Sequence, residues 1–401
     1  MDPDATLRAV TEAATFRAAV AALGADHDRT VADIIALTEI PAPPFQEAER
    51  AKAWMRKAAE QGLGELRQDA VGNVTALRRG SGDGDLLCVA AHLDTVFPPE
   101  TDVRVRRQGT RLLGPGVGDD TRALAVLLAF ARAMDAVGVR TRCDILFVAD
   151  VGEEGAGDLR GVRHLFQHGE YAGRIGAFIT LDSPDMNGIA TRGIGSRRYR
   201  VTFNGPGGHS WAAFGLVNPM HALAATVTQL ASLPVPTSPR TTFCASRAGG
   251  GTSINAIPNS VWAEFDLRSE AAEALDGLDR QFLRLVESAV SEENARRAGR
   301  VSVEVAKIGD RPAGRTEESH WLPRLAFAAI AQQGFAPRFE ASSTDANIPM
   351  SLGIPAIKIG SGGTGGRAHS LEEWIDVEPE ASVRGMAAGL AIVVGAAGLV
   401  S

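Results

Sequence analysis

The sequence is poor in aromatic residues and in cysteine. Phe, Trp and Tyr make up 5% of its 401 residues, and the cysteines are Cys88, Cys143 and Cys244. A small, odd number of cysteines in a chain of this length argues against a disulfide framework, which needs several paired cysteines in a short secreted domain. We therefore expect buried thiols in a reducing compartment.

The sequence also lacks an excess of positive charge. It contains 41 Lys and Arg residues against 48 Asp and Glu residues, which gives a net charge of −7, and it has no dense basic block. Proteins that bind nucleic acids usually carry a basic patch that faces the phosphates. The charge balance therefore argues against a nucleic-acid partner.

Long hydrophobic runs are missing as well. The most membrane-like stretch, residues 386–400, is shorter than the roughly 20 residues that a membrane-spanning helix needs. We expect it to form a buried helix packed on a sheet. The acidic N-terminus also lacks the apolar segment of a signal peptide. These features predict a cytoplasmic protein with no membrane partner.

The length and the order of the expected elements predict two domains. A chain of 401 residues is too long for one ordinary core. Strands and helices alternate from residue 71 to 182, which is typical of a mostly parallel α/β sheet flanked by helices. Residues 193–311 follow the order β-α-β-β-α-β of a ferredoxin-like α+β unit. We expect this unit to be inserted into a catalytic domain formed by residues 1–192 and 312–401. Helical spacing also predicts three N-terminal helices, at Leu7–Leu23, Arg29–Thr38 and Glu47–Gln61.

A histidine and an aspartate stand where the first buried strand is expected to end. The apolar run Leu86–Ala91 predicts a strand, and His92-Leu-Asp94 follows it. Side chains two apart on a strand share a face, so His92 and Asp94 would project together. In open α/β sheets, ligands bind at the carboxyl ends of the strands. The pair is therefore a candidate metal site.

Further acidic and histidine residues recur at the ends of other expected elements. Glu153 and Glu154 follow the run Cys143–Asp150, Asp182 ends a run that starts at Gly176, Asp119 and Asp120 precede the helix Thr121–Val137, and His369 follows the strand Ile354–Ile359 through a glycine-rich loop. So many carboxylates in one crevice would raise one another's pKa values and cost stability unless cations compensate them. Two divalent metal ions would do so, and carboxylate and imidazole ligands suit Zn²⁺ or a similar ion.

The joint order of these motifs resembles a known family. The motifs are His92-Leu-Asp94, Gly118-Asp119-Asp120, Glu153-Glu154-Gly155, Leu181-Asp182, Gly207-Gly208-His209-Ser210, Gly250-Gly251-Thr252-Ser253-Ile254-Asn255 and His369. From about Thr30 to the C-terminus the chain is similar to the di-zinc metallohydrolases of metallopeptidase family twenty, which include peptidase T, carboxypeptidase G, aminoacylase and acetylornithine deacetylase. The resemblance implies two metal ions per chain, with zinc expected and cobalt or manganese as alternatives.

The resemblance also implies roles for single residues. His92, Asp119 and Asp182 would bind one metal, and Asp119, Glu154 and His369 would bind the other, with Asp119 as the bridge. Glu153 would be the general base, and Asp94 would orient His92. Many relatives have Lys two residues after the bridging Asp, where this chain has Thr121. Asp120 therefore stays open as the alternative bridge, and Asp119 is favoured.

Four further residues are candidates for contact with the substrate. In relatives, the His and Asn that correspond to His209 and Asn255 act at an active site, often that of the partner subunit, so the resemblance implies a homodimer through the inserted domain. His209 would stabilise an oxyanion, and Arg268 lies where many relatives bind a substrate carboxylate. Gly363 belongs to a loop that would offer N–H groups to an anionic substrate or would only connect the strand to His369.

These observations predict an enzyme that hydrolyses amide or peptide bonds of small substrates. An aminopeptidase or a di- or tripeptidase is expected, with a metal-bridged water as the nucleophile and Glu153 as the base. The alternative keeps the same site but acts on an N-acyl amino acid or an aromatic amide. A non-catalytic protein that only holds metal is a third reading, and the presence of Glu153 argues against it.

Overall fold

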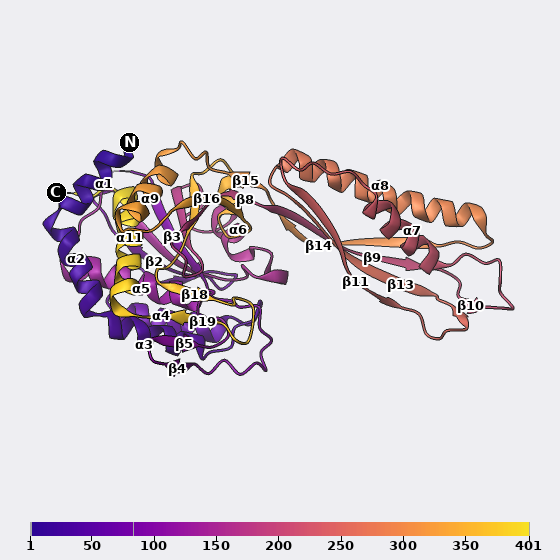
Figure 1. Cartoon of the computed structure of the whole chain (residues 1–401), viewed down its shortest axis with the longest axis horizontal. Helices are drawn as coiled ribbons and strands as arrows, with labels where there is room; N and C mark the ends of the chain where they lie inside the picture. Colours follow the sequence, from indigo (N-terminus) through magenta and orange to yellow (C-terminus); the bar gives the residue numbers. More distant parts are fainter. Residues whose placement is uncertain (1, 83, 401) are drawn as a thin grey trace. The chain divides into compact units, whose positions relative to one another are not determined.

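The computed structural model describes residues 2–82 and 84–400, and they form two compact units (Figure 1). The first unit comprises Met1–Gly193 and Arg315–Ser401, and the second comprises Ile194–Gly314. The first unit is a helix-flanked, largely parallel sheet and the second is an α+β sandwich, so the expected fold class is confirmed.

A nine-stranded sheet forms the centre of the first unit. Its strands follow the order β1 (Arg67–Gln68), β2 (Val74–Arg78), β6 (Ile145–Asp150), β3 (Leu86–His92), β7 (Ile175–Leu181), β17 (Ala356–Ile359), β8 (Gly188–Gly193) and β15 (Gly314–Arg315), and β16 (Arg338–Ser342) pairs with β8. β6, β3, β7 and β17 run parallel to one another. Both β3 and β6 are buried at every residue, as expected of parallel strands covered on both faces.

Helices cover both faces of this sheet. The larger core joins alternate residues of β3, such as Val89, to the following helices: α1 (Pro3–Glu12), α2 (Ala14–Ala25), α3 (His27–Thr38), α4 (Ala48–Glu60), α5 (Thr121–Ala136), α9 (Trp321–Gln332) and α11 (Pro379–Ala397). The other face, with Cys88, packs against α6 (Arg160–Gln167) and α10 (Asn347–Ser351). A 3-10 turn, η1 (Gly155–Gly157), follows the acidic pair Glu153-Glu154.

Two expectations about helices have different outcomes. The prediction of one helix over Leu7–Leu23 is wrong, because the backbone is extended at Ala13 (φ −69°, ψ 132°) and separates α1 from α2. The apolar spacing continues across this break, so the sequence pattern does not indicate that the helix ends at Ala13. The buried helix expected near the C-terminus is present as α11. With 19 residues and a mean hydropathy of 1.3 over its most apolar 18-residue stretch, α11 is long and apolar enough to span a membrane, but 78% of that stretch is buried within the protein.

A second, small sheet of the first unit joins the loops that precede two candidate ligands. It has the order β18 (Thr364–Gly366), β19 (Trp374–Asp376), β5 (Arg111–Leu113) and β4 (Arg106–Gln108), and each pair is antiparallel. β5 is followed by the loop to Asp119, and β18 is followed by the loop to His369. This sheet therefore ties together two segments that lie about 250 residues apart in the sequence.

The second unit is a four-stranded antiparallel sheet with two helices on one face. The strand order is β11 (Thr241–Gly250), β13 (Ser260–Ser269), β9 (Gly195–Asn204) and β14 (Ser302–Arg311), and the helices are α7 (Pro219–Ala231) and α8 (Ala272–Arg296). Burial alternates along β13 at every residue, so one face packs on the helices. Two short strands, β10 (Gly208–His209) and β12 (Ala256–Ile257), pair beside this sheet.

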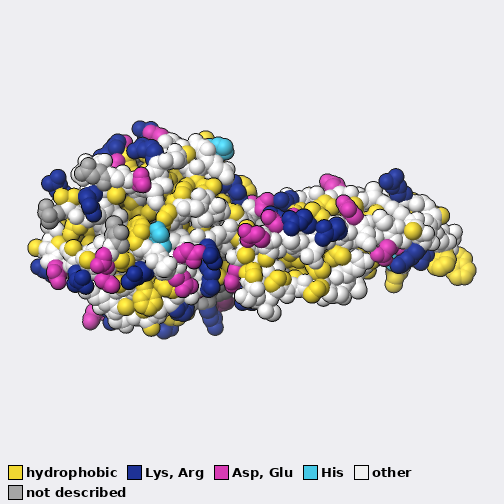
Figure 2. All heavy atoms as spheres, turned by 90° about the horizontal axis from the view of Figure 1, so that it is seen from above, with side chains coloured by type: hydrophobic (Ala, Val, Ile, Leu, Met, Phe, Trp, Pro, Cys, Tyr) yellow, Lys and Arg dark blue, Asp and Glu magenta, His cyan; other side chains and the backbone are white. Residues whose placement is uncertain are grey.

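The surface of the chain carries both signs of charge. In the view of Figure 2, basic and acidic side chains are interspersed over the face that is shown. Many of them form ion pairs, such as Arg200 with Glu264 and Arg268 with Asp266 on β9 and β13.

Candidate metal centre

The strand order of the large sheet places the candidate ligands at one edge. β3 lies between β6 and β7, and His92, at the end of β3, is in register with Asp150, at the end of β6. Glu153 and Glu154 follow β6, and Asp182 follows β7 directly. Because these strands are parallel, their carboxyl ends meet at the same edge. The topology therefore brings these residues to one edge of the sheet, as the motif positions predict.

Asp119 occupies the middle of the cluster. One of its carboxylate oxygens lies 3.1 Å from Nε2 of His92, and the other lies 3.1 Å from Nε2 of His369. The same His369 nitrogen is 2.9 Å from Oε1 of Glu154. The two oxygens of one carboxylate thus face two separate imidazoles.

A second group shares His92. Ligand atoms of His92, Asp120 and Asp182 lie within 4.8 Å of one another, as do those of His92, Asp119 and Glu154. The main-chain N–H of His92 also donates to Oδ2 of Asp120 (3.2 Å). Asp120 is therefore part of the cluster, but it does not face His369 in the way that Asp119 does.

Asp94 positions its neighbours in a manner that differs in detail from the expectation. Nδ1 of His92 lies 3.0 Å from the main-chain oxygen of Asp94 and 3.9 Å from its carboxylate. The ring is therefore oriented by the carbonyl, which leaves Nε2 toward Asp119. The Asp94 carboxylate instead accepts the main-chain N–H groups of Glu153 (3.0 Å) and Glu154 (2.8 Å). It fixes the acidic loop rather than the imidazole.

The electrostatics of the cluster indicate a site for cations. Burial raises the pKa values of Asp94, Asp120 and Asp182. The hydrogen bonds to Asp119 and Glu154 raise the pKa of His369 to about 11. Burial opposes ionisation of Asp119, but its contacts with His369 and His92 hold its pKa below the usual range. This many buried carboxylates need positive charge close by, and divalent cations would supply it.

The residues fit divalent metal ions by their chemistry as well. They offer imidazole nitrogens and carboxylate oxygens, which are ligands of zinc and of similar ions. Oδ1 of Asp120 is buried and has no hydrogen-bond partner among the described residues. An unsatisfied buried carboxylate oxygen is costly unless a cation or another donor meets it.

Glu373 is a residue of this site that the sequence analysis missed. It is 2% exposed, and its carboxylate accepts three main-chain N–H groups, those of Gly116 (2.8 Å), Gly118 (2.7 Å) and Asp119 (2.9 Å). It therefore holds the backbone of the loop that presents Asp119. Burial raises its pKa to about 7. The available sequence signal was weak, because Glu373 stands in an acidic pair on an apparent loop.

A buried pair of aspartates was missed too. Asp150 and Asp345 are 0% and 1% exposed. Burial raises the pKa of Asp150 to about 7, and burial together with Asp150 raises that of Asp345 well above its usual range. Asp150 ends β6, so the strand-end rule could have identified it. Asp345 lies in a loop before α10 that no motif marked.

His209 and Asn255 lie together, but in the second unit. β10 pairs with β12, and the N–H of Ser210 donates to the Asn255 carbonyl at 2.8 Å. Nδ1 of His209 accepts from the main-chain N–H groups of Trp211 (3.2 Å) and Ala212 (3.4 Å). An Nδ1 atom that accepts leaves Nε2 as the donor of a neutral imidazole. Nε2 of His209 can thus act as a hydrogen-bond donor.

Two other predicted contact residues have different surroundings. Arg268 is near the end of β13 that lies away from β12, roughly 26 Å from its first residue along an extended strand. Its Nε donates to Asp266 at 2.7 Å, so it is not grouped with Asn255. Gly363 is buried, and a Cβ there would lie 3.1 Å from the guanidinium of Arg122. The lack of a side chain at Gly363 therefore makes room for Arg122, and its role in binding stays a prediction.

The fold and this cluster define a metal-dependent hydrolase, and the chain belongs to the peptidase family M20/M25/M40, whose profile matches residues 88–395. The predicted class, metal-dependent hydrolysis of peptide or amide bonds, is confirmed by this membership. The fold is similar to that of an aminopeptidase PepT from Bacillus cereus, with 22% identity, a TM-score of 0.74, and 92% of this chain and 98% of that chain covered. It is also similar to a tripeptidase from Staphylococcus aureus, with 18% identity, a TM-score of 0.76, and 92% and 99% covered.

A relative by sequence is a succinyl-diaminopimelate desuccinylase from Leptothrix cholodnii. It is 26% identical over 230 residues, which are 53% of this chain and 59% of that protein. The match thus spans less than two thirds of the relative's length. Among the similar structures is a dinuclear metal-binding peptidase of the same family, from Bacillus subtilis.

Proposed function

We propose that the protein hydrolyses small peptides as an aminopeptidase or a di- or tripeptidase, with two divalent metal ions held in the cluster around Asp119. The observation that carries this proposal is the placement of one Asp119 oxygen at 3.1 Å from His92 and the other at 3.1 Å from His369. His92, Asp119 and Asp182 would hold one ion, and Asp119, Glu154 and His369 the other. Zinc is the first expectation, with cobalt and manganese as alternatives.

The metal ions would act on the scissile carbonyl and on a water molecule. When bound, the two ions would polarise the scissile carbonyl and lower the pKa of a water molecule toward neutrality. All other steps belong to side chains of the protein.

Glu153 is the proposed general base and general acid. Its carboxylate would take a proton from the attacking water and deliver it to the leaving nitrogen, which departs only as an amine. The support is its position: it directly precedes Glu154, is 6% exposed, and has its main chain held by Asp94 at 3.0 Å. This contact fixes the main chain from which the Glu153 carboxylate projects.

His209 is proposed to donate a hydrogen bond to the oxyanion, and Asn255 to hold polar groups of the substrate. The hydrogen bonds at Nδ1 of His209 support this role, because they leave Nε2 as a donor. We also infer a cytoplasmic homodimer that pairs through the second unit and in which His209 acts on the partner's metal centre. Arg268 is the proposed partner of a substrate carboxylate.

A second candidate function keeps the same centre and changes the substrate to an N-acyl amino acid. It is favoured by the relative described as a desuccinylase. One assay distinguishes the two candidate functions. Metal-loaded protein is incubated with unblocked di- and tripeptides and with N-acylated amino acids, and the release of the amine is measured. Peptide cleavage supports the first proposal and cleavage of acylated amino acids supports the second. No cleavage of either class, with both metals bound, would contradict both.

A further inference from the structure

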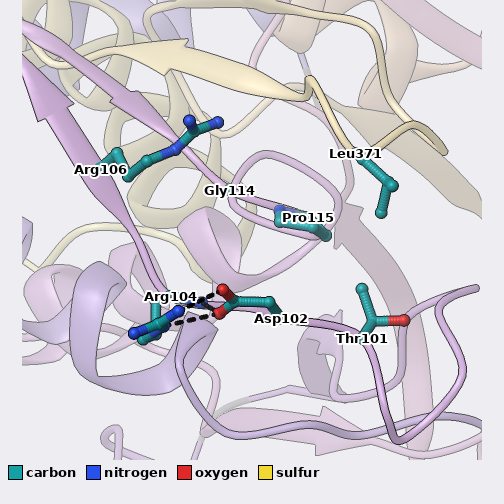
Figure 3. Close-up of a pocket in the computed structure, with 7 residues that line it drawn as sticks. All are labelled: Thr101, Asp102, Arg104, Arg106, Gly114, Pro115 and Leu371. Atoms are coloured by element: carbon teal, nitrogen blue, oxygen red, sulfur yellow. Dashed lines mark hydrogen bonds and ion pairs between the residues drawn. The ribbon is translucent and has the colours of Figure 1, made fainter.

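A cavity of about 720 Å³ opens in the first unit, and two of its lining residues, Pro115 and Leu371, lie close in the sequence to Asp119 and His369 (Figure 3). Its volume is in the range of sites for small molecules. It is lined by Thr101, Asp102, Arg104, Arg106, Gly114, Pro115 and Leu371. None of these residues belongs to the proposed metal ligands, and none has a role in the mechanism given above.

The chain itself limits how far this cavity can lie from the ligands. Leu371 follows His369 by two residues, a span of at most about 7 Å, and Pro115 precedes Asp119 by four residues, at most about 14 Å. The loop from Pro115 to Asp119 is held by Glu373 through its main-chain N–H groups. The cavity wall at Leu371 is therefore close to His369, and the wall at Pro115 is close to Asp119. A small substrate with its scissile bond at the centre can reach the cavity.

The charged residues of the lining are not equivalent. Arg104 donates to both carboxylate oxygens of Asp102, at 2.8 and 2.6 Å, so that this pair is internally neutral. In Figure 3 the two side chains face each other, whereas no dashed line reaches Arg106. Among the described residues, Arg106 has no hydrogen bond or ion pair from its side chain. The lining thus contains Arg104 and Arg106 against the single carboxylate of Asp102, and Asp102 forms its hydrogen bonds with Arg104.

The remaining side chains in the lining give the cavity an apolar wall. Leu371 is 60% exposed, although a leucine at the surface loses the benefit of burial. Pro115 lines the same cavity, and Thr101 adds a hydroxyl group. A ligand that fits carries an anionic group on a short apolar chain.

We propose that this cavity is a subsite for a carboxylate-bearing part of the substrate, bound by Arg106. The proposal rests on the proposed function and deepens it, because it selects amides with an acidic side chain or an acidic acyl group. A guanidinium binds a carboxylate through two parallel hydrogen bonds. Leu371 and Pro115 would contact the methylene groups that join this carboxylate to the amide bond.

The test uses two neighbouring arginines of β4. Arg107 is the matched control: it follows Arg106, so its side chain leaves the opposite face of the strand, and its Nε donates to the Gly109 carbonyl at 3.1 Å. Arg106→Gln and Arg107→Gln remove the same charge at adjacent positions. Each variant and the wild type are assayed on matched pairs, N-succinyl against N-butyryl amino acids and dipeptides with Glu against Gln at either position.

We expect Arg106→Gln to lower kcat/KM about 10- to 100-fold on the acidic member of a pair, mainly through KM, with the neutral member nearly unchanged. Arg107→Gln should leave both unchanged. Equal losses in the two variants, or a wild type without preference for any acidic member, would overturn the proposal.

A wild type that cleaves none of these amides would instead refute the proposed function. In that case the subsite is tested by calorimetric titration of metal-free protein with glutarate. Weaker binding to Arg106→Gln than to Arg107→Gln supports the subsite, and equal binding of the two variants refutes it.

Discussion

The buried carboxylate of Glu373 accepts a hydrogen bond from the main-chain N–H of Asp119 at 2.9 Å. The same carboxylate accepts the N–H groups of Gly116 and Gly118. The residue that faces both His92 and His369 is therefore itself held by an acid that lies 254 positions further along the chain. Hydrogen bonds of this kind orient the residues that bind a metal.

Glu373→Gln should weaken metal binding. An amide has one oxygen to accept hydrogen bonds, and its NH₂ group would face main-chain donors, so the loop before Asp119 would shift. We expect a 10- to 100-fold loss of metal affinity, as is usual when such supporting contacts are removed. Competition with a chelator of known affinity measures it. The control is Glu372→Gln, an exposed neighbour, and an equal loss in that variant would contradict the assignment.

Glu153→Gln should abolish turnover and leave the metals in place. The proposed role is proton transfer and not ligation, so a rate loss on the order of 10²–10⁴-fold is expected. Glu154→Gln, by contrast, should lower metal content, because Glu154 contacts His369 at 2.9 Å. Elemental analysis and amide cleavage are measured on the same samples. Activity close to that of the wild type in Glu153→Gln would end the proposed mechanism.

Two metal ions per chain should be found in active protein. Chelation should remove activity, and Zn²⁺, Co²⁺ or Mn²⁺ should restore it. Asp182→Ala and His369→Ala should each weaken a different site, so each variant should retain close to one ion. Fully active protein that contains no metal would show that the cluster has another role.

Asp345→Asn should change how stability depends on pH in the metal-free protein. The pKa values of Asp345 and Asp150 are raised in the folded chain. A raised acid pKa favours folding below the ordinary value near 4, and this contribution is lost as pH rises through about 7. Removal of one acid should therefore stabilise the protein at pH 8 and have little effect at pH 4. Urea unfolding at both pH values checks this, and an equal change at both would contradict it.

His209→Ala should be inactive if this residue serves the partner's centre. Mixed with Glu153→Gln under subunit exchange, it should regain part of the activity, because one site of the mixed dimer combines an intact Glu153 with an intact His209. Sedimentation analysis verifies that mixed dimers form. Mixed dimers that stay inactive, or a native protein that is an active monomer, would exclude the arrangement; His209 would then have to act by closure within one chain.

The local sequence pattern was sufficient to predict much of the fold. The run Leu86–Ala91 is apolar at every position, and such a strand can only be buried on both faces, as β3 is. The order β-α-β-β-α-β likewise predicted the sheet of the second unit, since alternation along β13 is a local property. The break at Ala13 was not predictable, because the apolar residues keep their spacing through it.

The sequence by itself determined which residues could meet at the candidate centre. His92, Glu154 and Asp182 each stand at or just after a strand end, and parallel strands end at one edge, so their proximity follows from local signals. Tertiary structure alone decided which carboxylate faces both imidazoles, and that Glu373 and Asp345 belong to the site. It also decided that Arg104 pairs with Asp102, whereas Arg106 has no side-chain hydrogen bond to any described residue. These facts depend on distances between segments far apart in the chain, and side-chain pairing across such distances leaves no periodic mark in the sequence.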